Sequence, residues 1–250
     1  MLVSEKNAFA GRMVDPDALP TDPGDFEGEL GASLQSWRAE GIRVVWLRLP
    51  IERASFVPIA VEAGFVYHHA DEAGVMLIAR LVSGSYAPPY ATHYIGAGGA
   101  VFTDDHKLLV IQERHHKRRH YKLPGGALHP GEHIVDAVCR EVEEETGIRT
   151  EFLSLVCFRH WHGYRHGKSD IYFVTRLKPL NLDINRDPRE IAEAFWMPVA
   201  EYLSHPDTHA FNRTIVRAAL QVHQNPTNAL SPGEIEGYGT PETHEMFFPG

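Results

Sequence analysis

Hydrophobic residues in the first third of the chain recur at the spacings of both helices and strands. Leu30, Leu34 and Trp37 lie three or four residues apart, so a helix is predicted over residues 26–40. The largely apolar run at 44–49, which ends before a proline, predicts a buried strand. By the same criteria a second helix is expected at 51–63, with strands near 65–69 and 75–82. This alternation predicts a small α/β layer structure.

The remaining two thirds of the chain show the same two periodicities. Two strands are predicted at 94–103 and 107–113, and a helix is predicted at 134–146 with Gly147 in the position of a C-terminal cap. The glycines at 96, 98 and 99 lack the spacing of a dinucleotide-binding loop, so close packing within the strand is expected. Further elements are expected at 152–160 and 170–177 (a hairpin), at 195–197 (a short strand) and at 208–223 (a helix).

A segment of small residues and prolines separates the two blocks. Residues 83–90 contain two serines, a glycine and the pair Pro88–Pro89, which interrupt regular structure and are typical of a linker. We therefore predict a first domain at residues 1–85, a linker at 86–92, a second domain at 93–225 and a C-terminal tail at 226–250.

Charge and cysteine content limit the function classes. The formal net charge of −9 argues against binding to DNA, because a phosphate backbone requires a cationic surface. It is compatible with a small anionic substrate if metal ions supply positive charge locally. Cys139 and Cys157 are too few for a disulfide scaffold or a four-cysteine zinc site. No apolar run suits a signal peptide or a membrane span, so a soluble cytoplasmic protein with no membrane partner is expected.

The helix predicted at 134–146 gathers acidic side chains on one side. At about 100° per residue its apolar residues share one face, and Glu141, Glu144 and Glu145 fall in an adjoining arc with Arg140 at its edge. Two carboxylates about 4 Å apart repel by roughly 4 kcal/mol at an effective dielectric constant near 20. A solvated acidic face is one explanation of this run, and a bound divalent cation is the other. Oxygen ligands favour Mg²⁺, with Mn²⁺ as a substitute.

The register of the whole segment from Gly126 to Ile148 favours the cation. It matches every fixed position of the pattern G-x5-E-x7-R-E-U-x-E-E-x-G-U, in which U is aliphatic. The matching residues are Gly126, Glu132, Arg140, Glu141, Val142, Glu144, Glu145, Gly147 and Ile148. On these residues the chain, from about 91 to 224, resembles the Nudix hydrolases. The resemblance implies an α/β/α sandwich in which this segment forms a loop–helix–loop.

The same resemblance implies roles for individual residues. Glu141, Glu144 and Glu145 look like the Mg²⁺ ligands, joined by the backbone carbonyl of Gly126 or of the glycine before it, and Gly126 also looks like a substrate contact. Arg140 looks like the residue that orients the glutamates through hydrogen bonds, and in this reading Arg140, Glu141 and Glu144 are catalytic.

Two further roles are implied outside this metal set. Glu132 looks like a salt-bridge partner that stabilises the loop. The general base that deprotonates the attacking water would be one of the helix glutamates or a carboxylate elsewhere. Glu190 and Glu193 are candidates by their position relative to Trp196, with an ordinary surface carboxylate as the alternative.

A second resemblance covers the first block. Residues 45–50, 64–70 and 75–77, with 158–160 and 169–173 downstream, look like the fibroblast-growth-factor-antisense subfamily of Nudix hydrolases, which is shared with plant ADP-ribose/NADH pyrophosphatases. This resemblance implies a first domain of the acyltransferase type. The sequence shows no glycine-rich loop for acetyl-CoA there, so a structural role is expected, as a homodimerisation element or as a wall of the substrate site.

Arg159 and Asp170, near the predicted hairpin turn, are candidate substrate-binding residues. Arg159 could bind a phosphate through two hydrogen bonds and Trp161 could stack on a base, with ordinary strand residues as the alternative. The expected reaction is Mg²⁺-dependent hydrolysis of the pyrophosphate bond in a nucleoside diphosphate linked to another moiety, first of all ADP-ribose or NADH. Dinucleoside polyphosphates, nucleoside triphosphates, capped RNA and a non-catalytic ligand-sensing module are the alternatives.

Overall fold

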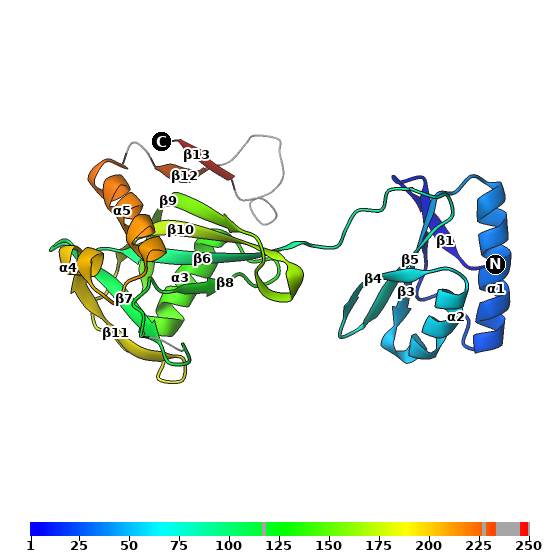
Figure 1. Cartoon of the computed structure of the whole chain (residues 1–250), viewed down its shortest axis with the longest axis horizontal. Coiled ribbons are helices and arrows are strands. Elements are labelled where there is room, and N and C mark those ends of the chain that lie inside the picture. Colours follow the sequence, from blue (N-terminus) through cyan, green and yellow to red (C-terminus); the bar gives the residue numbers. More distant parts are fainter. Residues whose placement is uncertain (117–118, 227–228, 234–245, 250) are drawn as a thin grey trace. The chain divides into compact units, whose positions relative to one another are not determined.

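The computed structural model describes residues 1–116, 119–226, 229–233 and 246–249. In it the chain forms two compact units, Met1–Thr92 and His93–Gly250 (Figure 1). Each unit buries its own hydrophobic side chains.

The first unit is built on a five-stranded sheet with the strand order β1-β2-β3-β5-β4. Helix α1 buries Phe26, Leu30 and Trp37, as the predicted periodicity requires, and the carboxylate of Asp22 caps it by accepting two backbone N–H bonds. The elements are β1 (Ser4–Asn7), β2 (Gly11–Val14), α1 (Pro23–Ala39), β3 (Val44–Pro50), a 3₁₀ helix (Ile51–Phe56), α2 (Val57–Glu62), β4 (Val66–Asp71) and β5 (Gly74–Arg80).

Two features of this unit differ from the sequence-based expectation. The single helix expected at 51–63 is wrong, because a 3₁₀ helix ends at Phe56 and the α-helix begins only at Val57. Pro58 lies in the first turn of α2, where its missing N–H is tolerated, whereas it would break a helix that ran through it. Strands β1 and β2 were not expected, because four residues each give too short a periodic signal.

The second unit contains a six-stranded sheet in the order β13-β12-β9-β10-β6-β8 and a separate pair, β11-β7. Strand β10 runs parallel to β6 and antiparallel to β9, which confirms the expected hairpin. The elements are β6 (His93–Val101), β7 (Lys107–Glu113), β8 (Gly125–Ala127), α3 (Ile134–Thr146), β9 (Thr150–Trp161), a 3₁₀ helix (Arg165–Gly167), β10 (Ser169–Pro179), β11 (Ile191–Pro198), α4 (Val199–Ser204), α5 (Ala210–Gln224), β12 (Leu230–Gly233) and β13 (Met246–Pro249).

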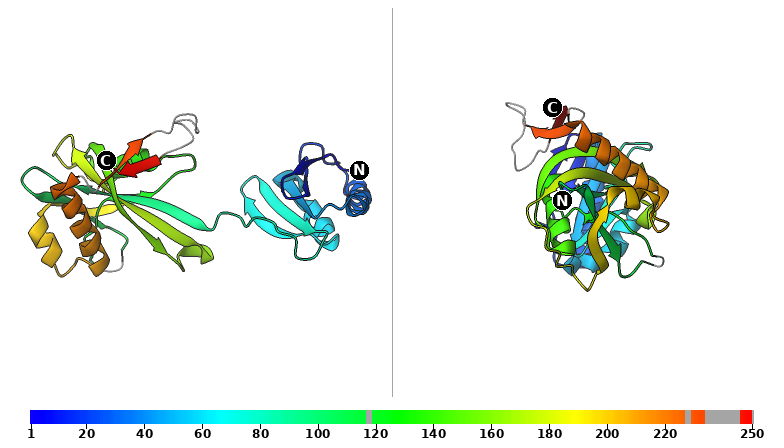
Figure 2. Two further views of the ribbon diagram at one scale, coloured as in Figure 1. Left: turned by 90° about the horizontal axis from the view of Figure 1, so that it is seen from above. Right: turned by 90° about the vertical axis from the view of Figure 1, so that its left-hand side faces the viewer.

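Helices α3 and α5 cover opposite faces of this sheet. Successive side chains of a strand alternate between faces, and on β10 Val174 packs with α5 whereas Leu177 packs with α3. The α5 cluster also contains Ile215 and Val216, and the views in Figure 2 show α5, in orange, lying across the strands. The α/β/α sandwich expected for residues 93–225 is therefore confirmed for this unit. Helix α4 and strand β8 were not expected, since both are too short to show a period.

The glycines of β6 are explained by packing rather than by ligand binding, as expected. A Cβ on Gly98 would lie 2.0 Å from the hydroxyl oxygen of Tyr172, and one on Gly96 would lie 3.2 Å from the same ring. The ring of Tyr172 therefore lies across β6 where this strand pairs with β8. This contact brings Tyr172 next to the Gly125–Gly126 segment.

The end of the chain adds strands to the sheet. Residues 230–233 form β12, which pairs with β13 and contacts the outer edge of β9 through Leu230 and Leu155. Phe247 of β13 lies 6.0 Å from Phe152 between ring centroids. None of the helices in the described residues is long and apolar enough to cross a membrane.

Candidate active site

Helix α3 carries the acidic side chains and is held by its opposite face. Val138 and Val142 are fully buried in the core that also contains Ala97 and Leu177. The helix ends at Gly147, whose φ of +73° closes the last turn in the left-handed conformation. The boundaries Ile134–Thr146 and the capping glycine confirm the prediction from periodicity.

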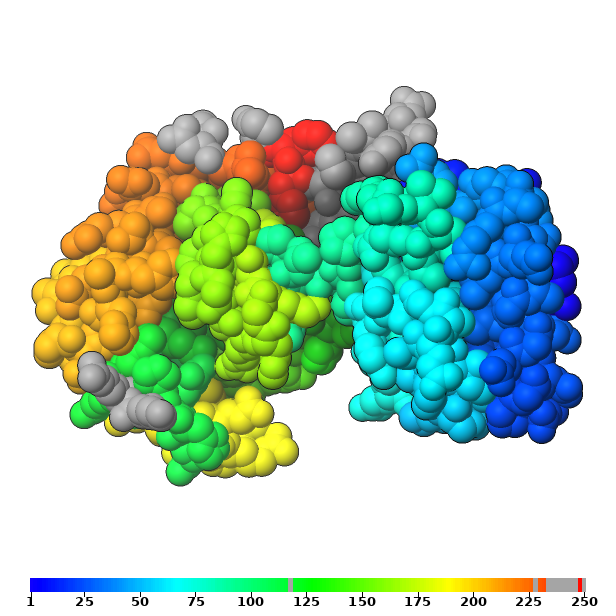
Figure 3. Space-filling model, turned by 45° about the vertical axis from the view of Figure 1, so that its right-hand side comes forward, coloured from blue at the N-terminus to red at the C-terminus, as the bar shows by residue number. Residues whose placement is uncertain are grey.

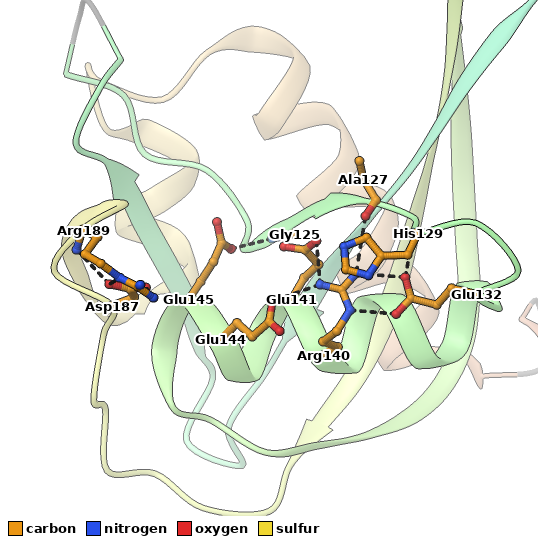
Figure 4. Close-up of polar contacts among 10 residues, drawn as sticks. All are labelled: Gly125, Ala127, His129, Glu132, Arg140, Glu141, Glu144, Glu145, Asp187 and Arg189. Carbon is orange, nitrogen blue, oxygen red and sulfur yellow. Dashed lines mark hydrogen bonds and ion pairs between the residues drawn. The ribbon is translucent and has the colours of Figure 1, made fainter. Parts of the chain in front are cut away.

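Arg140 is the centre of a hydrogen-bonded carboxylate network (Figure 4). Its Nε and one terminal nitrogen donate to the two carboxylate oxygens of Glu132 at 2.7 and 2.9 Å. The other terminal nitrogen donates to Glu141 and to Glu144, both at 3.0 Å. The hydrogen bond from Arg140 holds the pKa of Glu132 down to about 2, and the same carboxylate accepts the backbone N–H of His129. Arg140 therefore joins the loop before α3 to two acidic residues of the helix.

Glu141 lies against the backbone of Gly126. A Cβ built on Gly126 would meet the Glu141 carboxylate oxygens at 2.6 and 2.8 Å, closer than real contacts allow. Only glycine therefore fits at this position while Glu141 keeps its orientation. The Glu141 side chain is 17% exposed.

Glu145 is the most deeply buried of the three helix carboxylates, at 7% exposure. It accepts the backbone N–H of Gly125 at 2.7 Å. Burial raises the pKa of Glu145 to about 7, and the positive charge of Lys122 opposes this rise. Lys122 itself forms an ion pair with Glu113. Lys122 could not be selected from the sequence, because a strand pattern does not show which carboxylates a neighbouring lysine contacts.

Glu144 is the exposed member of the set, with a side chain 61% accessible and bonded to Arg140. The three carboxylates and the neighbouring backbone carbonyls offer only hard oxygen donors, which suits Mg²⁺ or Mn²⁺. As placed, however, Glu141 and Glu144 turn toward Arg140, and the described part of the chain contains no group of three His, Cys, Asp or Glu side chains close enough to hold a metal ion. The donor chemistry of these residues fits the metal.

The candidate bases outside the helix lie in different surroundings. Glu193 accepts hydrogen bonds from Arg119 and from the hydroxyl of Tyr121, so its carboxylate is already engaged. Glu190 is exposed, and its backbone oxygen accepts the N–H of Arg114. Two residues of this loop contact α3: the N–H of Asn185 donates to the backbone oxygen of Thr146 at 2.8 Å, and the N–H of Asp187 donates to the backbone oxygen of Glu145 at 3.2 Å. Sequence reasoning did not select Asp187.

Arg159 and Asp170 form an ion pair between β9 and β10. Asp170 is 6% exposed, and the Arg159 guanidinium lies over the rings of Tyr172 and Phe211 at 5.6 and 4.9 Å. Arg159, Tyr172 and Phe211 border a cavity of about 450 Å³. Its lining is formed by His120, Lys122, Leu123, Arg159, Tyr172, His209, Ala210, Phe211, Asn212 and Ile215. The sequence singled out Arg159 but not the α5 residues, because a helix pattern does not show which strand its first turn faces.

The fold and this arrangement define an α/β/α protein with a glutamate-rich helix set against a glycine pair. Comparison with known families is in agreement: the family described as "NUDIX domain" matches residues 92–219, and the one described as "Nudix hydrolase domain" matches residues 2–81. The chain belongs to the Nudix hydrolase family, and its class of activity is that of a pyrophosphohydrolase.

Named relatives cover both units. "Nudix hydrolase 8" of Arabidopsis thaliana is 40% identical over 82% of this chain, and the match spans 57% of that protein's length. "Nucleoside diphosphate-linked moiety X motif 6" of Homo sapiens is 37% identical over 88% of this chain and 72% of its own. Among solved structures, a Nudix hydrolase from Nitrosomonas europaea is similar with a TM-score of 0.45 and 24% identity, over 51% of this chain and 88% of that one.

Proposed function

We propose that this chain is a Mg²⁺-dependent diphosphatase that hydrolyses ADP-ribose or NADH, releasing AMP and a phosphorylated remainder. The observation that supports the proposal is the set of three carboxylates on α3 beside Gly125 and Gly126. Glu141 lies in van der Waals range of Gly126, and Glu145 is hydrogen-bonded to Gly125.

The α3 carboxylates and Arg140 have different proposed roles, which follow from their surroundings. Glu141, Glu144 and Glu145 would hold Mg²⁺, which would neutralise charge on the diphosphate when bound. Arg140 positions the acidic side chains, because its guanidinium is already fixed by both oxygens of Glu132. Glu144 is the most exposed of the three carboxylates and takes the proton of the attacking water. Hydrolysis then forms one P–O bond to the water oxygen and breaks the bridging P–O bond.

The test is a substrate panel with the purified full chain and Mg²⁺ or Mn²⁺. The panel contains ADP-ribose, NADH, a dinucleoside polyphosphate, a nucleoside triphosphate and a capped RNA, and products are weighed by mass spectrometry after reaction in ¹⁸O-labelled water. ADP-ribose or NADH should give the highest kcat/KM, with one ¹⁸O in a single product. Faster turnover of another panel member would replace the proposed substrate. No turnover of any member with either metal would overturn the enzymatic assignment.

A further inference from the structure

The end of the six-stranded sheet where β9 turns into β10 carries a band of aromatic rings. Trp161 of β9 and Tyr94 of β6 both align with Asp170 of β10, one on each side, so their side chains share one face of the sheet. Tyr164, in the connecting turn, contacts both, with ring centroids 5.2 Å from Trp161 and 5.7 Å from Tyr94. Trp161 and Tyr94 are 45% and 37% exposed. These three rings, the aromatic band, therefore present a partly exposed surface across three neighbouring strands.

Each ring of the aromatic band has a positively charged group beside it. The pairs, with the distance from the cationic group to the ring centroid, are Arg159 and Trp161 at 5.1 Å, Arg165 and Tyr164 at 5.3 Å, and Lys168 and Tyr94 at 6.0 Å. A flat base that stacks on one of these rings therefore brings its phosphate close to a cation. Rings for bases and cations for phosphates are the two components of surfaces that bind single-stranded nucleic acid.

The charge around the aromatic band is positive, although that of the whole chain is negative. No acidic residue occurs between Glu151 and Asp170, and this segment contains the cations Arg159, Arg165 and Lys168. Asp170 itself is 6% exposed and is paired with Arg159. The net charge of −9 is a sum over all residues, whereas the attraction of a polyanion depends on the charge of the surface that it meets. The net charge therefore does not exclude a nucleic acid at this end of the sheet.

The arrangement of the aromatic band favours unpaired bases over a double helix or a lipid surface. Bases in a duplex are stacked on one another, whereas bases of a single strand are free to stack on protein side chains. The strands that carry Trp161 and Tyr94 are separated by β10, which places them about 10 Å apart and leaves room for more than one base. The turn at residues 162–168 contains no aliphatic side chain that could enter a lipid layer.

From these observations we infer that the aromatic band and its cations bind a single-stranded nucleic acid. Bases stack on Trp161 and Tyr94, and Arg165 and Lys168 lie at the phosphates between them. In Figure 3 the β9–β10 region, in yellow-green, lies at the surface, where a strand has access to it. Binding of a strand needs neither metal nor hydrolysis, so it is independent of the diphosphatase activity.

Fluorescence anisotropy of a labelled single-stranded RNA of about 12 nucleotides measures this binding with the full chain, without added metal. The RNA has a 5′-hydroxyl end, so it offers no diphosphate to the carboxylate site. Trp161→Leu removes an exposed ring and should weaken binding about tenfold or more. Arg165→Gln removes an exposed cation and should reduce the slope of log K against log salt concentration by about 0.7.

Two control variants make the same kinds of substitution away from the aromatic band. Phe158→Leu is the control for the ring, because Phe158 is 64% exposed on β9 but faces the opposite side of the sheet from Trp161. Arg149→Gln is the control for the charge, since Arg149 is exposed directly before the first residue of β9, at the other end of that strand. Both should bind the RNA as the wild type does. Single-stranded DNA, the RNA duplex and vesicles containing phosphatidylserine are the comparison ligands.

Weaker RNA binding by both band variants than by both controls, with unchanged melting temperatures, supports the nucleic-acid surface even if no panel substrate is hydrolysed. If Trp161→Leu lowers the melting temperature, the salt slope of Arg165→Gln decides. No binding of single-stranded RNA or DNA by the wild type at low salt overturns the surface even if ADP-ribose is hydrolysed, and binding to the vesicles alone assigns it to lipid. Equally tight binding of the duplex, or wild-type binding by a folded Trp161→Leu, would also overturn it, because charge alone would then account for the attraction.

Discussion

Arg140 binds both carboxylate oxygens of Glu132, at 2.7 and 2.9 Å, although the two residues lie on either side of the start of α3. This bidentate contact orients the other terminal nitrogen of Arg140 so that it donates to Glu141 and Glu144. The loop that contains Glu132 and helix α3 are thus held together without a bound ligand. The orientation of the acidic cluster depends on the planar shape of the guanidinium as well as on its charge.

Arg140→Lys should lower turnover roughly 10- to 100-fold, since a single ammonium cannot hold Glu132 with two bonds and still reach the helix glutamates. Steady-state kcat at saturating Mg²⁺ measures the effect. Arg149→Lys, at an exposed position just beyond α3, serves as the control and should keep wild-type turnover. Equal rates in all three proteins would show that only the charge of Arg140 matters.

Replacing single carboxylates of α3 should show which side of the helix takes part in the reaction and which is only solvated. Glu144→Gln and Glu145→Gln should each lower kcat by about 10²-fold or more, because each removes a charge from the predicted metal site. Glu143→Gln is the matched control, since Glu143 is an exposed neighbour on the same helix. The measurement is kcat with circular dichroism of each variant. A loss in Glu143→Gln as large as in the other two would contradict the assignment of the face.

Gly126→Ala should reduce activity while the protein stays folded. The added methyl group would lie 2.6 Å from a carboxylate oxygen of Glu141, so that side chain must turn away from its present position. We expect a fall in kcat of roughly tenfold or more, since catalytic groups displaced by about 1 Å lose this much. Gly28→Ala, on α1 with open space around it, should leave kcat unchanged. A fully active Gly126→Ala enzyme would show that the close approach has no catalytic role.

Gly147→Ala should destabilise the second unit by more than about 1 kcal/mol. Its φ of +73° disfavours a side chain, and a Cβ there would also lie 2.9 Å from Cβ of Asn185. Gly163→Ala separates the two causes, because Gly163 has φ +77° with nothing within 4 Å. Urea unfolding monitored for both variants gives the comparison. A larger loss for Gly163→Ala would show that crowding at Asn185 contributes nothing.

His120 should make the free energy of unfolding depend on pH below about 6.5. Burial lowers the pKa of His120 to about 4 from an ordinary value of 6.5. Between these pH values the unfolded chain binds the proton and the folded chain does not. The contribution of His120 to the free energy of unfolding therefore rises with pH between about 4 and 6.5, and it is lost as the pH falls through this range. Urea unfolding at several pH values should show a shallower slope for His120→Gln than for wild type or for the exposed control His115→Gln. Parallel slopes in all three would contradict the assignment.

The long elements could be predicted from the sequence because each shows several periods of its pattern. Residues 134–146 and 107–113 are examples, whose observed boundaries are the predicted ones. The helix at 51–63 could not be predicted correctly, since a 3₁₀ turn and an α-turn have similar apolar spacing over so few residues. Pro58 was the available signal that the helix is not continuous, because a proline is disfavoured inside a helix.

The acidic helix could be selected from the sequence because its residues are close together along the chain. The cavity could not, because it depends on contacts between distant positions such as Arg159 and Phe211, which are 52 residues apart in number and meet only when α5 crosses the sheet. Likewise the pairing of Lys122 with Glu113, and its effect on Glu145, follow from register between strands. Local pattern carries no information on that register.

Strand β12 covers one position on the outer edge of β9, where Leu230 is paired with Leu155. Strand β9 would otherwise offer a row of unpaired backbone groups on its outer side, and such rims attract strands from other molecules. By pairing with β9 at Leu230, residues 230–233 occupy part of that edge and oppose the addition of a strand from another molecule there.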